Sequence, residues 1–248
     1  MKNENEFVSR WNELGQNFWN NRSSRQRWLH IYVLFPELLK IIKAGIHKEI
    51  LDYGCGDGSL ALFLVNNLPE SNVLAYDIAD EMRKEAQLHL GKARVVDDLS
   101  ERKFDVICAN MVIQAVEDPV RMLKELRSNL TADGRILVTV PHPVFSLIEN
   151  EHLTTKRMTV SPSKRKDIYR YLYEETEKVF WDFESEKHWT YLFNRTIQTY
   201  TGLFFNAGFS IEQIREPLPD KKGMKEKDLY RINSELPKTM LFCLRVFD

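Results

Sequence analysis

A glycine-rich turn that directly follows an apolar run is the part of the sequence best suited to hold a ligand. The run at residues 50–53 leads into Gly54, Gly56 and Gly58. Because glycine has no side chain, its backbone can take a positive φ and lie close to a bound group. The next apolar run ends on Asp77, about twenty residues after Gly56, where nucleotide-binding α/β folds place an acid that binds ribose hydroxyls. Loop and acid together predict a nucleotide-type cofactor site, whereas the loop alone fits an ordinary strand-to-helix turn.

The same turn resembles the first motif of class I S-adenosylmethionine-dependent methyltransferases. That motif is an acid, any residue and then Gly-Cys-Gly-x-Gly, and residues 52–58 read Asp-Tyr-Gly-Cys-Gly-Asp-Gly. The resemblance implies that the loop passes under the methionine part of S-adenosyl-L-methionine, that the opening acid orders water or the cofactor ammonium, and that S-adenosyl-L-homocysteine is the product. It assigns cofactor contacts to Asp52, Gly54, Cys55, Gly56, Asp77 and Ile78.

Further cofactor contacts follow from the same resemblance, which is close over residues 50–140 and looser from residue 196 onward. One of Asp97 and Asp98 is expected against the adenine amino group, with a polar pair that caps a loop as the alternative. Asn110 and Met111 open the segment that closes over the cofactor. Relatives often have histidine near the position of Gln114, so this sequence departs from the family there.

His142 is the candidate for chemistry on the methyl acceptor. Methyl transfer from a sulfonium is an in-line displacement, so holding the acceptor in place can supply much of the rate, and a base is optional. His142 lies between two prolines after the fifth predicted strand, at the edge where open α/β sheets bind ligands. A similar His-Pro-x-Phe occurs in a subgroup of small-molecule methyltransferases. His142 is therefore a candidate base or acceptor-positioning residue, and a histidine that fixes a loop hinge is the alternative.

Short apolar runs that alternate with amphipathic segments predict βαβ units around a parallel sheet. Strands are expected at residues 49–53, 72–77, 104–109, 135–140, 209–214 and 239–247, and helices at 59–67, 79–90, 119–130 and 196–206. With the resemblance, this predicts an α/β fold: a Rossmann-like, doubly wound, mostly parallel seven-stranded sheet with helices on both faces. A single methyltransferase domain is expected, with an N-terminal helical cap at 1–45, a cofactor-binding core at 46–141, an inserted lid at 142–195 and the rest of the sheet at 196–248.

Two segments are expected to close over the core. The N-terminal cap carries Arg27, a candidate partner for the cofactor carboxylate. The lid is rich in basic and aromatic residues rather than in sheet-like runs, and Trp181 and Tyr191 are its candidate acceptor contacts. The alternative is that these aromatic side chains form the packing of the lid itself.

Composition narrows the function further. Lysine and arginine number 35 against 36 aspartates and glutamates, so no net field draws the chain to nucleic acid or to an anionic membrane. No apolar leader or membrane-length stretch is present, which predicts a cytoplasmic protein. The cysteines at positions 55, 108 and 243 have neither a disulfide nor a metal-ligand spacing, so no metal site is predicted. The sequence indicates no oligomeric state.

These observations predict a methyltransferase that acts on a small organic molecule. A protein or RNA methyltransferase is one alternative, disfavoured by the balanced charge. A non-catalytic, cofactor-binding partner subunit is another. A dinucleotide dehydrogenase is unlike this chain, because its fingerprint needs a third glycine where Ser59 stands. The position of the methyl group on oxygen, nitrogen or carbon is left open.

Overall fold

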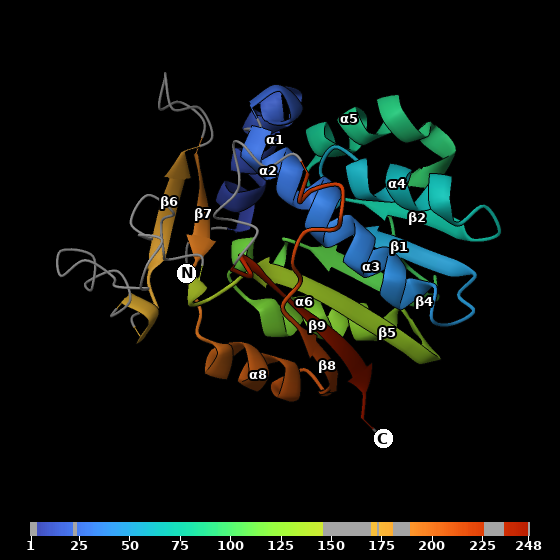
Figure 1. The fold of residues 1–248 in the computed structure, drawn as a ribbon. Coiled ribbons are helices and arrows are strands. Elements are labelled where there is room, and N and C mark those ends of the chain that lie inside the picture. The colour runs from blue at the N-terminus through green and yellow to red at the C-terminus, as the bar shows by residue number, and fades with distance from the viewer. Residues whose placement is uncertain are drawn as a thin grey trace.

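A seven-stranded sheet forms the centre of the protein in the computed structural model, which describes residues 4–21, 24–145, 170–172, 174–180, 189–225 and 236–247. The strands follow the order β3-β2-β1-β4-β5-β9-β8 (Figure 1). All adjacent pairs are parallel except those that β9 forms with β5 and β8. The predicted Rossmann-like fold is confirmed. The strands are β1 (Glu49–Tyr53), β2 (Asn72–Tyr76), β3 (Val95–Val96), β4 (Phe104–Asn110), β5 (Leu130–Pro141), β8 (Phe209–Arg215) and β9 (Thr239–Val246).

Helices cover both faces of this sheet because the central strands are apolar on both sides. Ile50 and Leu51 are neighbours in β1, yet Ile50 belongs to one buried cluster and Leu51 to the other. The Ile50 cluster includes residues of α3 (Phe35–Ile42), α4 (Ser59–Asn67) and α5 (Asp80–Leu90), and the Leu51 cluster includes residues of α6 (Pro119–Ser128) and α8 (Ile197–Asn206). The alternation of side chains along a strand therefore builds two cores, one on each face.

The helix starts agree with the signals in the sequence. Asp118 accepts a hydrogen bond from the backbone N–H of Arg121, and Pro119 occupies the first turn of α6. Thr196 accepts a hydrogen bond from the backbone N–H of Thr199 at the start of α8. Each side chain pairs with an N–H group that the helix leaves without a partner. The expected bounds of these helices differ from the observed ones by only one or two residues.

Three N-terminal elements lie over the edge of the sheet where the parallel strands end. They are α1 (Glu4–Asn21), α2 (Ser24–Leu29) and a π-helical turn η1 (His30–Leu34). Leu14 of α1 packs with Ala79 and Met82 at the start of α5. None of the described helices is long and apolar enough to cross a bilayer, and the cytoplasmic location stays a prediction.

The segment expected to lack sheet-like runs contains a hairpin, so that part of the prediction is wrong. β6 (Thr176–Phe180) and β7 (Trp189–Phe193) pair antiparallel and form a sheet of their own beside α1 (Figure 1). The ring of Phe7 in α1 lies 5.3 Å from that of Tyr191 and 5.9 Å from that of Phe193. The alternating aromatic residues of β7 thus pack on the N-terminal helix, since residues two apart share one face of a strand.

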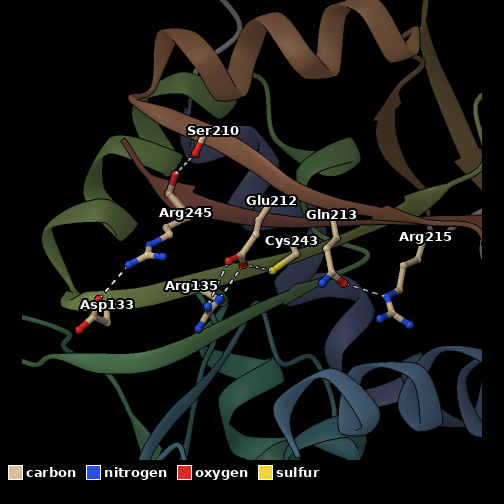
Figure 2. Close-up of polar contacts among 8 residues, drawn as sticks. All are labelled: Asp133, Arg135, Ser210, Glu212, Gln213, Arg215, Cys243 and Arg245. Carbon is tan, nitrogen blue, oxygen red and sulfur yellow. Dashed lines mark hydrogen bonds and ion pairs between the residues drawn. The ribbon is translucent and has the colours of Figure 1, made fainter. Parts of the chain in front are cut away.

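The outer, antiparallel part of the sheet carries a chain of polar contacts (Figure 2). Glu212 lies at a register shift between β8 and β9 and receives two hydrogen bonds from Arg135, at 2.7 and 3.1 Å. The thiol of Cys243 lies 3.3 Å from the same carboxylate. Burial, and then this carboxylate, raise the pKa of Cys243 to about 12. Charged side chains and a bulge on the outermost strand discourage pairing with other chains.

Candidate cofactor and acceptor site

A cavity of about 960 Å³ opens at the carboxyl ends of the parallel strands. Its floor comes from the residues that follow β1, β2 and β4 and from Pro141 at the end of β5. β1 and β4 are neighbours from which the chain winds in opposite directions, and open α/β sheets bind ligands at such a switch point. α1, η1 and both strands of the hairpin complete the wall, with Phe7, Trp11, His30, Val179 and Leu192.

The glycine loop forms the part of the floor after β1. Gly54, Gly56 and Gly58 have φ values of 68°, 54° and 77°. A Cβ atom on Gly54 would lie 2.5 Å from a methyl carbon of Val112. A side chain at this position would therefore clash with the segment after β4, in a backbone conformation that L-residues rarely adopt. Glycine at position 54 therefore allows the two loops of the cavity floor to pack closely against each other.

Asp77 lies at the end of β2 and fixes the loop. Its Oδ2 atom accepts a hydrogen bond from the backbone N–H of Gly56 at 2.9 Å, and its Oδ1 atom accepts one from Ala79 at 2.9 Å. The side chain is 9% exposed. Burial raises the pKa of Asp77 above its usual value, and these hydrogen bonds oppose the rise. A carboxylate has about four acceptor positions, so Asp77 can accept further hydrogen bonds from a ligand in the cavity.

Asp52 and Asp57 are two further buried acids of the cavity floor. Asp52 is 1% exposed, and its Oδ2 atom accepts a hydrogen bond from the backbone N–H of Ala61 in α4. Burial raises the pKa of Asp52 to about 8. The Oδ1 atom of Asp57 accepts hydrogen bonds from the backbone N–H and the hydroxyl of Ser59, at 3.0 and 2.5 Å. Asp57 was not predicted from the sequence, although Asp-x-Ser before a helix is a signal for such a turn.

A chain of hydrogen bonds sets the orientation of His30, another residue that was not predicted from the sequence. The Thr139 hydroxyl accepts a hydrogen bond from the backbone N–H of Met111. The same hydroxyl donates a hydrogen bond to the amide oxygen of Asn110. The Asn110 amide nitrogen then donates to Nδ1 of His30 at 3.3 Å. Nδ1 is therefore an acceptor, so the ring proton is on Nε2. π-Helical turns often occur at functional sites, and the one that begins with His30 lines the cavity.

Eight of the residues predicted to contact the cofactor line this one cavity, and three do not. Those in its wall are Asp52, Gly54, Cys55, Gly56, Asp77, Ile78, Asn110 and Met111. Met111 has a φ of 58°, unusual for a residue with a side chain. Arg27, Asp97 and Asp98 are not in the wall. Asp98 is exposed and accepts hydrogen bonds from the backbone and hydroxyl of Ser100, which is the loop-capping alternative to an adenine contact.

His142 is buried outside the cavity wall. It is 2% exposed, and its Nδ1 atom accepts hydrogen bonds from the backbone N–H groups of Val144 and Phe145, both at 3.1 Å. The proton is therefore on Nε2, which donates to Glu216 at 2.7 Å. Both ring nitrogens hold the turn after β5, so the geometry corresponds to the hinge alternative. Tyr191 faces α1 and is absent from the wall, and Trp181 lies outside the described residues.

Arg195 connects the hairpin to the cavity floor and was not found from the sequence. Its two terminal nitrogens donate to the backbone oxygens of Ile113 and Val116, at 2.8 and 2.7 Å. These two oxygens flank Gln114 in the 3₁₀ turn η3 (Ile113–Ala115). The guanidinium also lies 4.9 Å from the ring of Phe193. A single charged group thus fixes the turn after β4, which lines the cavity, to the segment between β7 and α8.

Residues 20–214 match a family model described as a methyltransferase domain. The chain belongs to this methyltransferase family. A protein of Haemophilus influenzae without an assigned function is 25% identical over 199 residues, which cover 74% of this chain and 75% of that one. A malonyl-[acyl-carrier protein] O-methyltransferase of Ilyobacter polytropus is 27% identical over 133 residues, half of either chain. A trans-aconitate 2-methyltransferase of Rhodopseudomonas palustris is 28% identical over 127 residues, covering 49% of this chain and 48% of its own.

Solved methyltransferase structures share the fold. An S-adenosylmethionine-dependent methyltransferase of Mesorhizobium loti superposes with a TM-score of 0.61, at 19% identity, over 85% of this chain and 96% of its own. DhpI, solved as a complex with S-adenosylhomocysteine, gives a TM-score of 0.59 at 14% identity, over 98% and 96% of the two chains. The predicted methyltransferase family and its fold are confirmed, and S-adenosylmethionine or S-adenosylhomocysteine is named for both of these solved relatives.

Proposed function

We propose that this methyltransferase transfers the methyl group of S-adenosylmethionine to a small organic molecule held between the cavity floor and the hairpin. The proposal rests on a cavity that joins the glycine loop and Asp77 to apolar side chains of α1 and the hairpin. The polar floor suits a nucleoside with an amino-acid tail, and the apolar wall suits an organic acceptor. The chain spans about half the length of the two named relatives, so their acceptors are not assigned to it.

The residues of the floor fit the chemistry of this cofactor. The buried Asp77 would accept hydrogen bonds from the ribose hydroxyls, and the close approach of the backbone at Gly54 and Gly56 would admit the methionine part. Asp52 would face its ammonium group, which would favour the charged form of this carboxyl. When bound, S-adenosylmethionine supplies a methyl group on a sulfonium.

Catalysis by this chain would consist mainly of placing the acceptor in line with the methyl group. Positioning of this kind can replace a general base. The His30 ring, which Asn110 orients, lies in the cavity wall and would help to place the ligand. His142 and Glu216 would keep the turn after β5 in place. The lid role of residues 142–195, the other domain boundaries and the part of Trp181 stay predictions.

The test separates small-molecule from macromolecular acceptors. The purified chain is incubated with S-adenosylmethionine that carries tritium in its methyl group, and with a bacterial extract. The mixture is then divided into a small-molecule filtrate and a protein and RNA fraction. Label is expected in the filtrate products and lost with Asp77→Ala. Label in acid-precipitable protein or RNA would favour the macromolecular alternative. Binding of the cofactor without transfer to either fraction would favour a non-catalytic subunit.

A further inference from the structure

The amide oxygen of Gln114 is a buried acceptor without a hydrogen-bond partner in the described part of the protein. Gln114 is 8% exposed and belongs to the cavity wall. A buried polar atom that has lost its water and gained no partner is unfavourable, and native structures rarely keep one without a reason. In a cavity that must hold an acceptor molecule, such an oxygen marks a position at which a ligand can donate a hydrogen bond.

The backbone on both sides of Gln114 is held in place. Arg195 binds the oxygens of Ile113 and Val116, and the N–H of Val116 donates back to Ile113 within the same turn. The backbone of the turn is therefore fixed before any ligand binds, and the Gln114 side chain that it carries is only 8% exposed. Preorganised polar groups of this kind recognise a ligand at low entropic cost.

The charge of the wall indicates what kind of ligand this is. Among the described residues of the wall, arginine occurs once, at Arg121, and its Nε atom donates to Glu125 at 3.1 Å. The acids in the same wall are Asp52, Asp57, Asp77, Glu117, Asp118 and Glu125. Asp52 and Asp77 would lie against the cofactor, so the acids in the rest of the wall are Asp57, Glu117, Asp118 and Glu125, against one arginine. This excess of negative charge would repel a carboxylate acceptor. A neutral or cationic acceptor avoids this repulsion.

We propose that Gln114 binds the methyl acceptor through its amide oxygen, and that the acceptor carries an N–H or O–H group and no net negative charge. This rests on the proposed function. An acceptor that arrives as an ammonium ion first gives one proton to water, and the lone pair of its nitrogen, or that of a hydroxyl oxygen, then forms the bond to the methyl carbon. The carbon–sulfur bond breaks with its electron pair left on sulfur, and the proton that Gln114 oriented passes to water.

The test uses pairs of acceptors that share a skeleton and differ in charge: phenethylamine and 3-phenylpropionate, tryptamine and indole-3-propionate, and tyramine and 3-(4-hydroxyphenyl)propionate. Formation of S-adenosylhomocysteine is measured with the full chain and S-adenosylmethionine. At least one amine is expected to react with a kcat/KM tenfold or more above that of its carboxylate partner. Equal or faster reaction of the carboxylates, or no reaction of any amine, would overturn the proposal.

Variants of Gln114 test the residue itself. Gln114→Met keeps the length of the side chain and removes the oxygen, so KM for the reacting amine should rise at least tenfold, with kcat changed much less. Gln114→Glu restores an acceptor oxygen and should recover part of the loss. Because the oxygen has no partner in the free protein, Gln114→Met should melt at the wild-type temperature or above it. An unchanged KM in Gln114→Met would refute the role.

Binding of S-adenosylhomocysteine keeps the two proposals apart. Calorimetry should give the same Kd, within twofold, for the wild type and Gln114→Met. If wild-type protein binds the nucleotide but methylates only carboxylates, this inference fails and the proposed function stands. If it binds no nucleotide, the proposed function fails.

Discussion

Replacement of Arg195 by methionine is expected to destabilise the protein substantially. The change keeps most of the aliphatic stem and removes two hydrogen bonds to the oxygens of Ile113 and Val116, at 2.8 and 2.7 Å. A hydrogen bond to a charged group contributes about 1.5–3 kcal/mol, and the contact with the ring of Phe193 adds about 0.5–1 kcal/mol. Because the guanidinium is only partly buried, we take the low end of each range, which for the two hydrogen bonds and the ring contact together gives about 3.5 kcal/mol in the free energy of unfolding.

Urea unfolding followed by circular dichroism measures this quantity, with linear extrapolation to water. In Arg195→Lys the single ammonium group can bind only one of the two oxygens. Because one hydrogen bond to a charged group is kept, the free energy of unfolding should fall by about half as much as in Arg195→Met. Arg102→Met is the matched control, since this exposed arginine donates one 3.2 Å hydrogen bond to a backbone oxygen, and its effect should stay within about 0.5 kcal/mol. If Arg195→Met also stayed within that range, Arg195 would not be what fixes the turn that carries Gln114.

Three further predictions concern the floor and the hinge. Asp77→Ala should weaken S-adenosylhomocysteine binding by about 1–3 kcal/mol, or roughly 5- to 150-fold in Kd, while Asp98→Ala should leave calorimetric binding unchanged; equal losses would disprove the assignment. Burial raises the pKa of Asp52 to about 8, against about 4 in the unfolded chain, so stability falls as the pH rises between these values. Asp52→Asn cannot ionise, so it avoids this loss of stability. The Tm of the variant should exceed that of the wild type by more at pH 8.5 than at pH 5. A difference in Tm that does not depend on pH would contradict a raised pKa of Asp52. His142→Ala should lower the free energy of unfolding by about 1–3 kcal/mol with S-adenosylhomocysteine affinity within twofold, and a loss of turnover without a loss of stability would restore its catalytic role.

The sequence was sufficient where function depends on residues close together along the chain. The glycine loop and Asp77 lie at the ends of consecutive strands, so parallel pairing brings them together whatever the rest of the fold does. Asn110 and Met111 were predicted from the family resemblance, and the structure places them at the end of the strand that pairs with β1 on its other side. The pairing of the glycine loop with Asp77 needed only the period of apolar residues and the spacing along the chain, whereas the other cofactor contacts needed the resemblance.

The parts that were missed depend on contacts between distant segments. Arg195 meets the turn at Ile113 across 82 positions, and Asn110 meets His30 across 80. No local pattern encodes such a pairing. His142 was judged by its place at the end of a strand, but the orientation of its ring depends on Glu216, 74 positions away. The two-residue strand β3 has too few apolar residues to show a period.

The central claim is that the cavity binds the sulfur nucleotides of methyl transfer. Parallel calorimetric titrations of the purified protein with S-adenosylmethionine, S-adenosylhomocysteine and NAD test it most directly. We expect saturable one-to-one binding of both sulfur nucleotides, weakened in Asp77→Ala, and no binding of NAD. Binding of NAD alone would contradict the account and point to a dinucleotide enzyme.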